Sequence, residues 1–336
     1  MMTAPEPAAT MATLPSAVTL DHQPTARNRF RRFDVVGDPR RVFRAIATNQ
    51  IARFFPGLYV RLTGETGRGD RTEEAPEDLA QYYRDSLDDY VRHIQFILRR
   101  KEARLAGSVV LEYGPGDFPG VAALAIANGA EKVFCVDRFP LLNVNQKNAR
   151  ALAELIDGCT GTQRERLIAC LRERTNPAAG LDHRYVEYLV RPSGLSGLNG
   201  SVDIVLSRAV LEHVDDLDAT FQDMFTALKP GGIAVHKVDL RSHGLHRSNP
   251  LDFLVWPDWL WRSMYSHKGA PNRHRVDAYR RVVSRLPVMS VEFLTTSSAD
   301  ALHVNAVRPK LAKPFRGIPD EDLACLGFWL LMRKQV

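Results

Sequence analysis

Short apolar runs and helical stripes alternate through the middle of the chain. The run at 109–111 leads into a glycine turn at 114–117, and a small apolar helix is predicted over 121–128, between a proline and a glycine. A second apolar run occupies 132–136. Short continuous apolar runs are typical of strands buried in a parallel sheet. The segment therefore predicts a strand–turn–helix–strand unit.

The same alternation returns further along the chain. A strand is predicted over 203–206, ending in a polar turn at 207–208. The apolar residues of 217–228 then recur at the spacing of a helix that lies on a sheet. A Lys-Pro-Gly-Gly sequence ends this helix, and a further strand is predicted over 233–238.

Three further elements extend the pattern. The stretch 78–99 carries a long helical stripe, closed by basic residues at its carboxyl end. A strand is predicted over 186–189, and the sequence 162–165 reads as a capping box that opens a short helix. Strands that alternate with helices in this way favour an α/β fold.

Carboxylates flank the first glycine turn. Glu112 precedes it, Asp117 ends it, and Asp137 follows the second strand, where an acid can meet a ribose. The turn departs from the dinucleotide pattern, because Pro119 replaces the third glycine and two carboxylates disfavour a pyrophosphate. The same carboxylates suit a ligand that carries an ammonium and a sulfonium. These residues predict that the cofactor is S-adenosylmethionine.

Together with two later motifs, this turn resembles class I S-adenosylmethionine-dependent methyltransferases. Glu112, Gly114 and Gly116 match motif I of that family, E-x-G-x-G. The sequences L-E-H-V at 211–214 and L-K-P-G-G at 228–232 match its signatures around the fourth and fifth strands.

The resemblance covers roughly residues 105–240 and implies a Rossmann-like, seven-stranded, mostly parallel sheet with helices on both faces. The Trp- and Leu-rich run 323–334 would be its last, antiparallel strand. Many members carry an acid after the third strand, whereas this chain has Val190 and Arg191 there. The cofactor site implied by the resemblance consists of Glu112, Gly114, Pro115, Gly116, Asp117, Asp137, Arg138 and Ser207.

The chain is expected to divide into three parts. Residues 1–26 are rich in Ala, Pro, Thr and Ser without a usable period, which predicts a disordered tail. Residues 27–104 would form an N-terminal helical lid, and 105–336 the methyltransferase domain. One insertion in that domain, at about 158–180, is expected to be either a solvated addition or a dimer contact.

A second insertion follows the fifth strand, at about 241–275, and is rich in aromatic residues, among them Trp256 and Trp259. Ligands of open α/β sheets bind beyond the carboxyl ends of the strands, where this segment begins. We therefore expect its aromatic side chains to close the acceptor pocket, although they could also only bury one another.

Transfer to a hydroxyl calls for a general base or a metal. His213, His236, Asp239 and His243 lie near the expected edge of the sheet. Strand alternation puts His236 and Asp239 on opposite faces, whereas Asp239 could orient His243 once the strand has ended. His243 is the first choice for the base. No metal site is predicted, since the sequence shows no paired acids there.

The composition gives little information about which partners the protein binds. The formal net charge of +6 favours nucleic acid, but the turn after the fourth strand lacks the D-P-P-Y or N-P-P-Y sequence that resemblance to base-amino methyltransferases would require. Four cysteines without paired spacing imply neither zinc nor disulfides. No run reaches the roughly 18 apolar residues of a membrane span, so a cytoplasmic protein is expected.

The sequence therefore predicts an S-adenosylmethionine-dependent methyltransferase that acts on a hydroxyl of a small molecule or glycan. A methyltransferase for RNA or another macromolecule, and a non-catalytic binding subunit with the same fold, are the alternatives. A homodimer is left open.

Overall fold

The computed structural model describes residues 39–68, 73–100, 105–214, 216–246 and 248–336. The expected tail at 1–26 lies outside the described residues. Within the described part of the chain, no helix combines the length and the apolar character that crossing a membrane requires.

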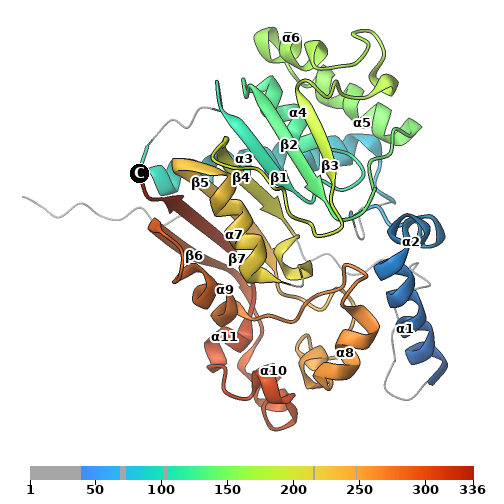
Figure 1. Cartoon of the computed structure of the whole chain (residues 1–336), viewed down its shortest axis with the longest axis vertical. Coiled ribbons are helices and arrows are strands. Elements are labelled where there is room, and N and C mark those ends of the chain that lie inside the picture. Colours follow the sequence, from blue (N-terminus) through green and yellow to red (C-terminus); the bar gives the residue numbers. More distant parts are fainter. Residues whose placement is uncertain (1–38, 69–72, 101–104, 215, 247) are drawn as a thin grey trace, which may run out of the picture.

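A single seven-stranded sheet, in the order β3-β2-β1-β4-β5-β7-β6, runs through the molecule (Figure 1). The first five strands are parallel, and β7 pairs antiparallel with both β5 and β6. The strands are β1 (Val109–Tyr113), β2 (Lys132–Asp137), β3 (Val186–Val190), β4 (Val202–Arg208), β5 (Leu228–Asp239), β6 (Val288–Ser298) and β7 (Cys325–Lys334). This is the Rossmann-like, mostly parallel architecture expected from the sequence.

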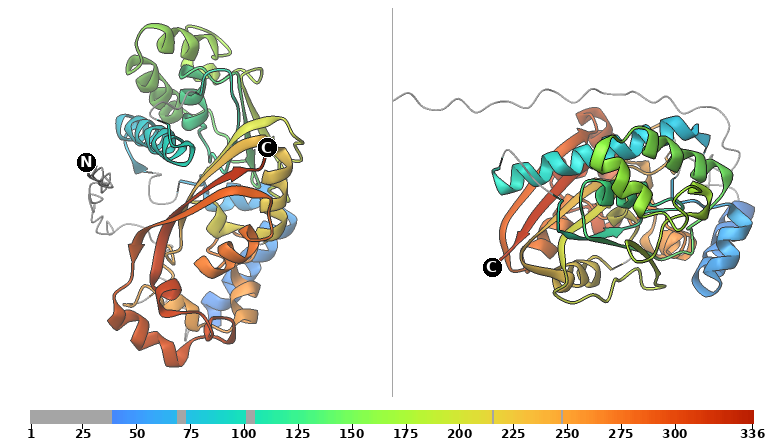
Figure 2. Two further views of the ribbon diagram at one scale, coloured as in Figure 1. Left: turned by 90° about the vertical axis from the view of Figure 1, so that its left-hand side faces the viewer. Right: turned by 90° about the horizontal axis from the view of Figure 1, so that it is seen from above.

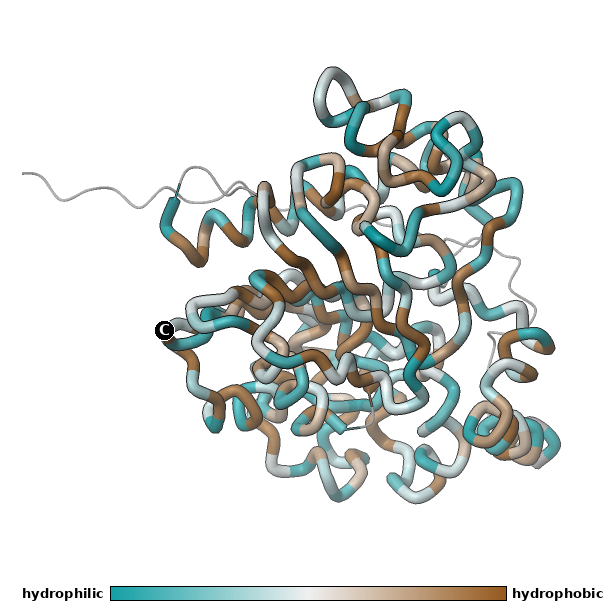
Figure 3. The backbone as a smooth tube through the Cα atoms, turned by 45° about the horizontal axis from the view of Figure 1, so that its top comes forward, coloured by the Kyte–Doolittle hydropathy of each residue, from teal (hydrophilic) through white to brown (hydrophobic). Residues whose placement is uncertain are grey.

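Helices cover both faces of the sheet (Figures 1 and 2). One face packs against α3 (Pro76–Leu98), α4 (Gly120–Ala127) and α5 (Gln146–Asp157), with α6 (Gly161–Ala169) against α4. The other face packs against α7 (Leu217–Ala227) and α9 (Val276–Val283). Alternate strand residues serve the two cores, and the central strands form the most apolar part of the trace (Figure 3).

A third, smaller core lies beside the sheet, below β6 and β7 in Figure 1. It joins α1 (Pro39–Phe54), α8 (Asp258–Tyr265), α10 (Ala301–Val307) and α11 (Asp320–Ala324), while α2 (Pro56–Thr63) packs on α1. Short 3-10 turns occur at Pro177–Ala179, Leu211–His213, Asp252–Val255, Arg308–Lys310 and Lys313–Phe315.

Several predicted elements are confirmed. The β1–α4–β2 unit, β3 and the antiparallel β7 lie where the sequence indicated them. The stripe on α3 is also confirmed, because its six apolar residues, Leu79, Tyr83, Leu87, Tyr90, Ile94 and Ile97, are all buried.

Three local predictions are wrong. Strand β4 continues through Ser207 and Arg208, which pair with β5, so no turn forms there. Strand β5 begins at Leu228, because the backbone around Gly231 (φ 76°) forms a bulge in the pairing with β4. Helix α6 begins one residue earlier than the predicted capping box, and its N-cap Thr160 makes no capping hydrogen bond.

Candidate active site

The glycine turn after β1 is closely packed on two sides. Gly114 (φ 64°) and Gly116 (φ 73°) both have left-handed backbone angles that favour glycine. A Cβ atom on Gly114 would lie 2.3 Å from Cγ2 of Val210, in the segment after β4. A Cβ atom on Gly116 would lie 3.1 Å from the carbonyl oxygen of Thr66. The backbone angles and these close contacts with the protein's own residues both favour glycine at the two positions.

Asp137 lies at the carboxyl end of β2, directly beside this turn. Its Oδ1 accepts a hydrogen bond from the backbone N–H of Phe139 (3.1 Å). Burial raises the pKa of Asp137 to about 6, against opposing hydrogen bonds from backbone N–H groups that include that of Gly116. The carboxylate and the glycine turn therefore fit the ribose and the main chain contacts of an adenosine-bearing cofactor.

Glu112 points away from the turn and under α4. It is 6% exposed, and its Oε2 accepts from Cys135 Sγ (3.8 Å). Burial raises its pKa to about 8, partly offset by hydrogen bonds from Cys135 and from the backbone N–H of Ala122. Since Ala122 lies in the first turn of α4, Glu112 satisfies a helix N-terminus beneath the glycine turn.

Asp117 is occupied by protein groups. It is 1% exposed and forms an ion pair with Arg68, with Nε 2.8 Å from Oδ1. Asn148 Nδ2 donates to the same carboxylate, and the Asp117 backbone N–H donates to the carbonyl of Thr66. The segment Gly64–Arg68 is thereby fixed on the glycine turn. Sequence reasoning missed Arg68, and no spacing signal connects it to a residue 49 positions away.

The other predicted cofactor residues differ in their surroundings. Pro115 is buried within the turn. Nη2 of Arg138 makes a hydrogen bond with Nδ1 of His267 (3.1 Å). Ser207 is fully buried, and its Oγ lies 2.8 Å from Nδ1 of His236, which is also fully buried. Burial lowers the pKa of His236 to about 3. His236 therefore lies in the core against α7, away from the edge where the other histidines gather.

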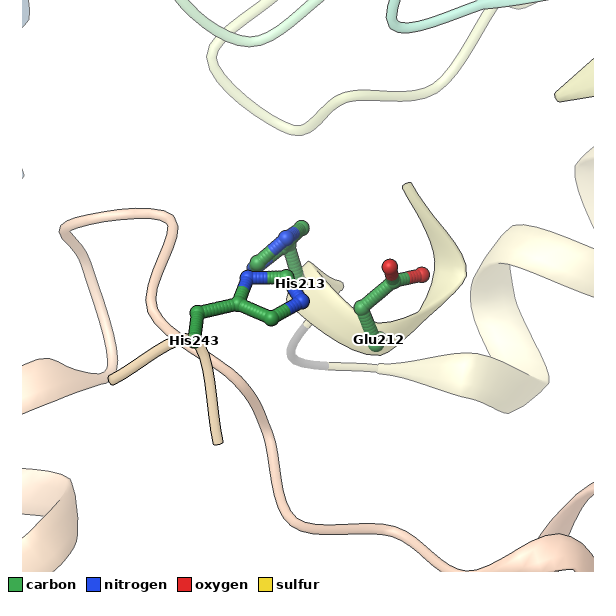
Figure 4. A group of neighbouring side chains, drawn as sticks. All are labelled: Glu212, His213 and His243. Atoms are coloured by element: carbon green, nitrogen blue, oxygen red, sulfur yellow. The ribbon is translucent and has the colours of Figure 1, made fainter. Parts of the chain in front are cut away.

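The remaining candidates meet at the carboxyl edge of β4 and β5. Figure 4 shows Glu212 and His213, from the turn after β4, together with His243 from the loop after β5. One potential ligand atom of each residue lies within 4.8 Å of the others. The two imidazole centroids are 4.9 Å apart, and His243 Nε2 lies 3.7 Å from Asp239 Oδ2. The predicted meeting of Asp239 and His243 is present in the structure.

Burial and charge act differently on the members of this cluster. Burial raises the pKa of Glu212 well above its usual range and lowers that of His213 to about 3, where neighbouring His243 acts in the same direction. Burial also raises the pKa of Asp239, but hydrogen bonds from His243 and Arg241 outweigh it and hold that pKa well below the ordinary value. Asp239 is therefore a stable carboxylate beside His243.

The aromatic insertion contributes to the site in an unexpected way. Its buried aromatic residues fill the third core, Trp256 packs partly buried at that core, and Trp259 is 69% exposed. The polar residues at the end of this insertion contact the turn of Glu212 and His213 instead. Asn272 Nδ2 donates to the carbonyls of Leu211 and Val214 (2.9 and 2.8 Å), so it fixes the turn that carries Glu212 and His213.

The fold and the turn after β1 define an α/β protein with a nucleoside-cofactor site at the carboxyl edge of its sheet. A model of a family described as a methyltransferase domain matches residues 81–284, which is more than half of the chain. The chain belongs to this family, the class I S-adenosylmethionine-dependent methyltransferases, and S-adenosylmethionine is the cofactor of the family. A search of curated proteins finds no match to the sequence.

Solved structures with similar folds have low sequence identity. An S-adenosylmethionine-dependent methyltransferase from Mesorhizobium loti is 16% identical, over 69% of this chain and 93% of that chain, with a TM-score of 0.36. A phosphoethanolamine N-methyltransferase 2 from Haemonchus contortus is 15% identical, over 73% of this chain and 52% of that chain, with a TM-score of 0.40. A geranyl diphosphate methyltransferase is 15% identical, over 75% of this chain and 77% of that chain, with a TM-score of 0.41.

Proposed function

We propose that this methyltransferase transfers its methyl group to a hydroxyl oxygen of a small molecule or glycan. The observation that carries the proposal is the cluster of Glu212, His213, Asp239 and His243 beside the glycine turn. Val210, three residues before His213, is the residue that Gly114 contacts, so the cluster and the cofactor turn are neighbours.

The chemistry explains why such a cluster indicates an oxygen acceptor. S-adenosylmethionine supplies a methyl group that is already electrophilic, so the protein must align the acceptor, exclude water and remove the hydroxyl proton. A neutral hydroxyl oxygen is a weaker nucleophile than an amine nitrogen, whose free lone pair attacks without prior loss of a proton, so a group that removes the hydroxyl proton is valuable. In the metal-free protein, His243 takes this proton, and Asp239 orients its imidazole and stabilises the imidazolium.

The cofactor site is proposed around the glycine turn. Gly114 and Gly116 form a tight left-handed turn beside the cofactor, Asp137 accepts hydrogen bonds from the ribose hydroxyls, and Glu112 stabilises the start of α4 next to the turn. We also propose that residues before 105 cover the cofactor, which is supported by the ion pair of Arg68 with Asp117.

The test is a methylation assay of the purified full chain with hydroxyl-bearing small molecules and glycans, each paired with its amine analogue. Formation of S-adenosylhomocysteine and of a methyl ether is expected for one hydroxyl series. His243→Ala should abolish it, whereas His303→Ala, a matched change on α10, should not. Methylation of RNA or of amines alone would contradict the proposal.

A further inference from the structure

We propose that Glu212, His213 and His243 bind one divalent transition-metal ion of the zinc class. This inference deepens the proposed function, and only its catalytic consequence rests on that function. The three side chains come from two loops at the carboxyl edge of the sheet and lie beside one another (Figure 4).

The spacing of the three side chains suits a single ion after a small movement. Their ligand atoms lie within 4.8 Å of one another. Zinc binds nitrogen and carboxylate ligands at about 2.0–2.2 Å in a tetrahedral arrangement, so two of its ligand atoms are about 3.3–3.6 Å apart. His243 is the residue able to close this difference, because it is half-exposed on a loop, whereas Asn272 fixes the turn of Glu212 and His213.

Two buried polar atoms of the cluster have no hydrogen-bond partner among the described residues. Glu212 is 1% exposed, yet its Oε2 has no hydrogen-bond partner among the described residues, and the same holds for the buried Nδ1 of His213. Buried polar atoms are normally paired, since leaving one unpaired is costly. A cation between them would satisfy both atoms at once, and its binding would release any proton held by Glu212.

The donor set selects the kind of cation. Two imidazoles and one carboxylate suit zinc and its transition-metal neighbours, whereas magnesium and calcium prefer oxygen ligands. The outer contacts are those of a metal site, since Asp239 lies 3.7 Å from the His243 imidazole and a backbone hydrogen bond at Ala270 orients that of His213. Asp239 itself is engaged by Arg241 and remains an outer residue.

Three protein ligands leave a coordination position open, as in catalytic zinc sites. An acceptor hydroxyl in that position would have its pKa lowered by the ion and would lose its proton to solvent as the methyl group arrives. In the loaded protein His243 is then a ligand, and in the metal-free protein it is the base. Both forms require His243, but they differ in their response to a chelator.

The direct test uses Co²⁺ as a spectroscopic substitute for zinc. Full-length protein freed of metal by chelation is titrated with Co²⁺, followed by its visible absorption, and with Zn²⁺, followed by calorimetry. One ion per chain is expected to bind. Glu212→Gln and His213→Ala should each weaken binding about tenfold or more. The control His303→Ala should bind as the wild type does.

His243→Ala serves as a second variant, because this half-exposed loop residue is the one least required for folding. It too should lose the cobalt spectrum. The absence of a cobalt spectrum in the wild type, or an unchanged spectrum in His213→Ala and His243→Ala, would overturn the inference.

Activity separates this inference from the proposed function. Full methyl-ether formation in metal-free protein, together with loss of activity in His243→Ala, would overturn the catalytic role of the ion and leave the hydroxyl acceptor standing. Stoichiometric metal binding that depends on His213 and His243, in a protein that methylates only amines, would support the site and overturn the proposed acceptor.

Discussion

At the residue scale, the proposed ribose contact of Asp137 predicts that cofactor binding depends on pH. Burial raises its pKa to about 6, and a ribose requires the carboxylate as hydrogen-bond acceptor. The affinity for S-adenosylmethionine should therefore fall as the pH falls through about 6, because protonation then competes with binding. Calorimetry of the wild type and of Asp137→Asn across that range measures this. The variant should bind about tenfold or more weakly at neutral pH and show a flatter profile.

A matched control for that measurement is Asp157→Asn, which changes a carboxylate at the exposed end of α5. It should follow the wild-type profile. Equal affinity of the wild type at acidic and neutral pH would show that Asp137 does not hold the ribose.

Glu112 gives a second prediction, on stability. Its pKa is raised from 4.5 to about 8 in the folded protein, so the folded state binds a proton that the unfolded state has lost. Its contribution is fully present below about pH 4.5 and is lost as the pH rises through about 8. The Tm of Glu112→Gln, relative to wild type, should therefore rise between these pH values. A constant difference in thermal melts would contradict the assignment.

Sequence reasoning succeeded at residues whose partners are near in the chain. The pairing of Asp239 with His243 followed from strand alternation and a short loop. The sequence assigned Glu112 to the ammonium of the cofactor. In the structure this side chain lies under α4, because strand alternation at β1 points it to that face. Arg68 was missed, since its partner Asp117 is distant in sequence.

At the scale of elements, the segment Gly64–Arg68 is the contact between the N-terminal helices and the glycine turn. Its ion pair is nearly fully buried, with side-chain exposures of 6% for Arg68 and 2% for Asp117. Breaking a buried pair from one side typically costs about 3–5 kcal/mol. Arg68→Met should therefore lower the Tm strongly and weaken cofactor binding.

The control for this change is Arg285→Met, which breaks the exposed pair with Asp218, where about 0–1 kcal/mol is expected. Denaturant titration compares the two variants. Similar losses of stability in both variants would mean that the segment Gly64–Arg68 does not hold the glycine turn.

The aromatic insertion shows why element prediction needs tertiary context. The apolar residues of the insertion were correctly identified, but an apolar pattern in the sequence does not show which part of the protein it packs against. Trp261 is 4% exposed within the third core, while Trp259, two positions away, is exposed. The polar Asn272 contacts the turn of Glu212 and His213, and side-chain to main-chain hydrogen bonds of this kind leave no periodic signal in the sequence.

This difference predicts contrasting variants. Trp259→Ala should leave the Tm and methyl transfer nearly unchanged, whereas Trp261→Ala should destabilise the protein by about 3–5 kcal/mol. Asn272→Ala should instead lower kcat with cofactor affinity retained, because the turn of Glu212 and His213 loses two hydrogen bonds. Steady-state kinetics and thermal melts distinguish the three. An inactive but stable Trp259→Ala would restore the predicted pocket role.

At the scale of the whole molecule, the sheet was predicted best where its strands are buried on both faces. The parallel strands and β7 read as apolar runs, and the family motifs supplied their order. Strand β6 was not located from the sequence, because this edge strand has mostly half-buried or exposed residues and no apolar run. The glycine turn follows β1, Asp137 ends β2, and the histidine cluster follows β4 and β5, so all three lie at one edge of the sheet.

The proposed reaction is methyl transfer to a hydroxyl oxygen, and it depends on His243. Its most direct test is to incubate the protein with deuterium-labelled S-adenosylmethionine and hydroxyl-bearing acceptors, and to identify the labelled atom of the product by mass spectrometry. Transfer to a hydroxyl with His243 as the base predicts a labelled methyl ether and a loss of about 10²–10⁴ in kcat for His243→Ala with cofactor affinity retained. A label on nitrogen, or wild-type turnover in His243→Ala, would contradict it.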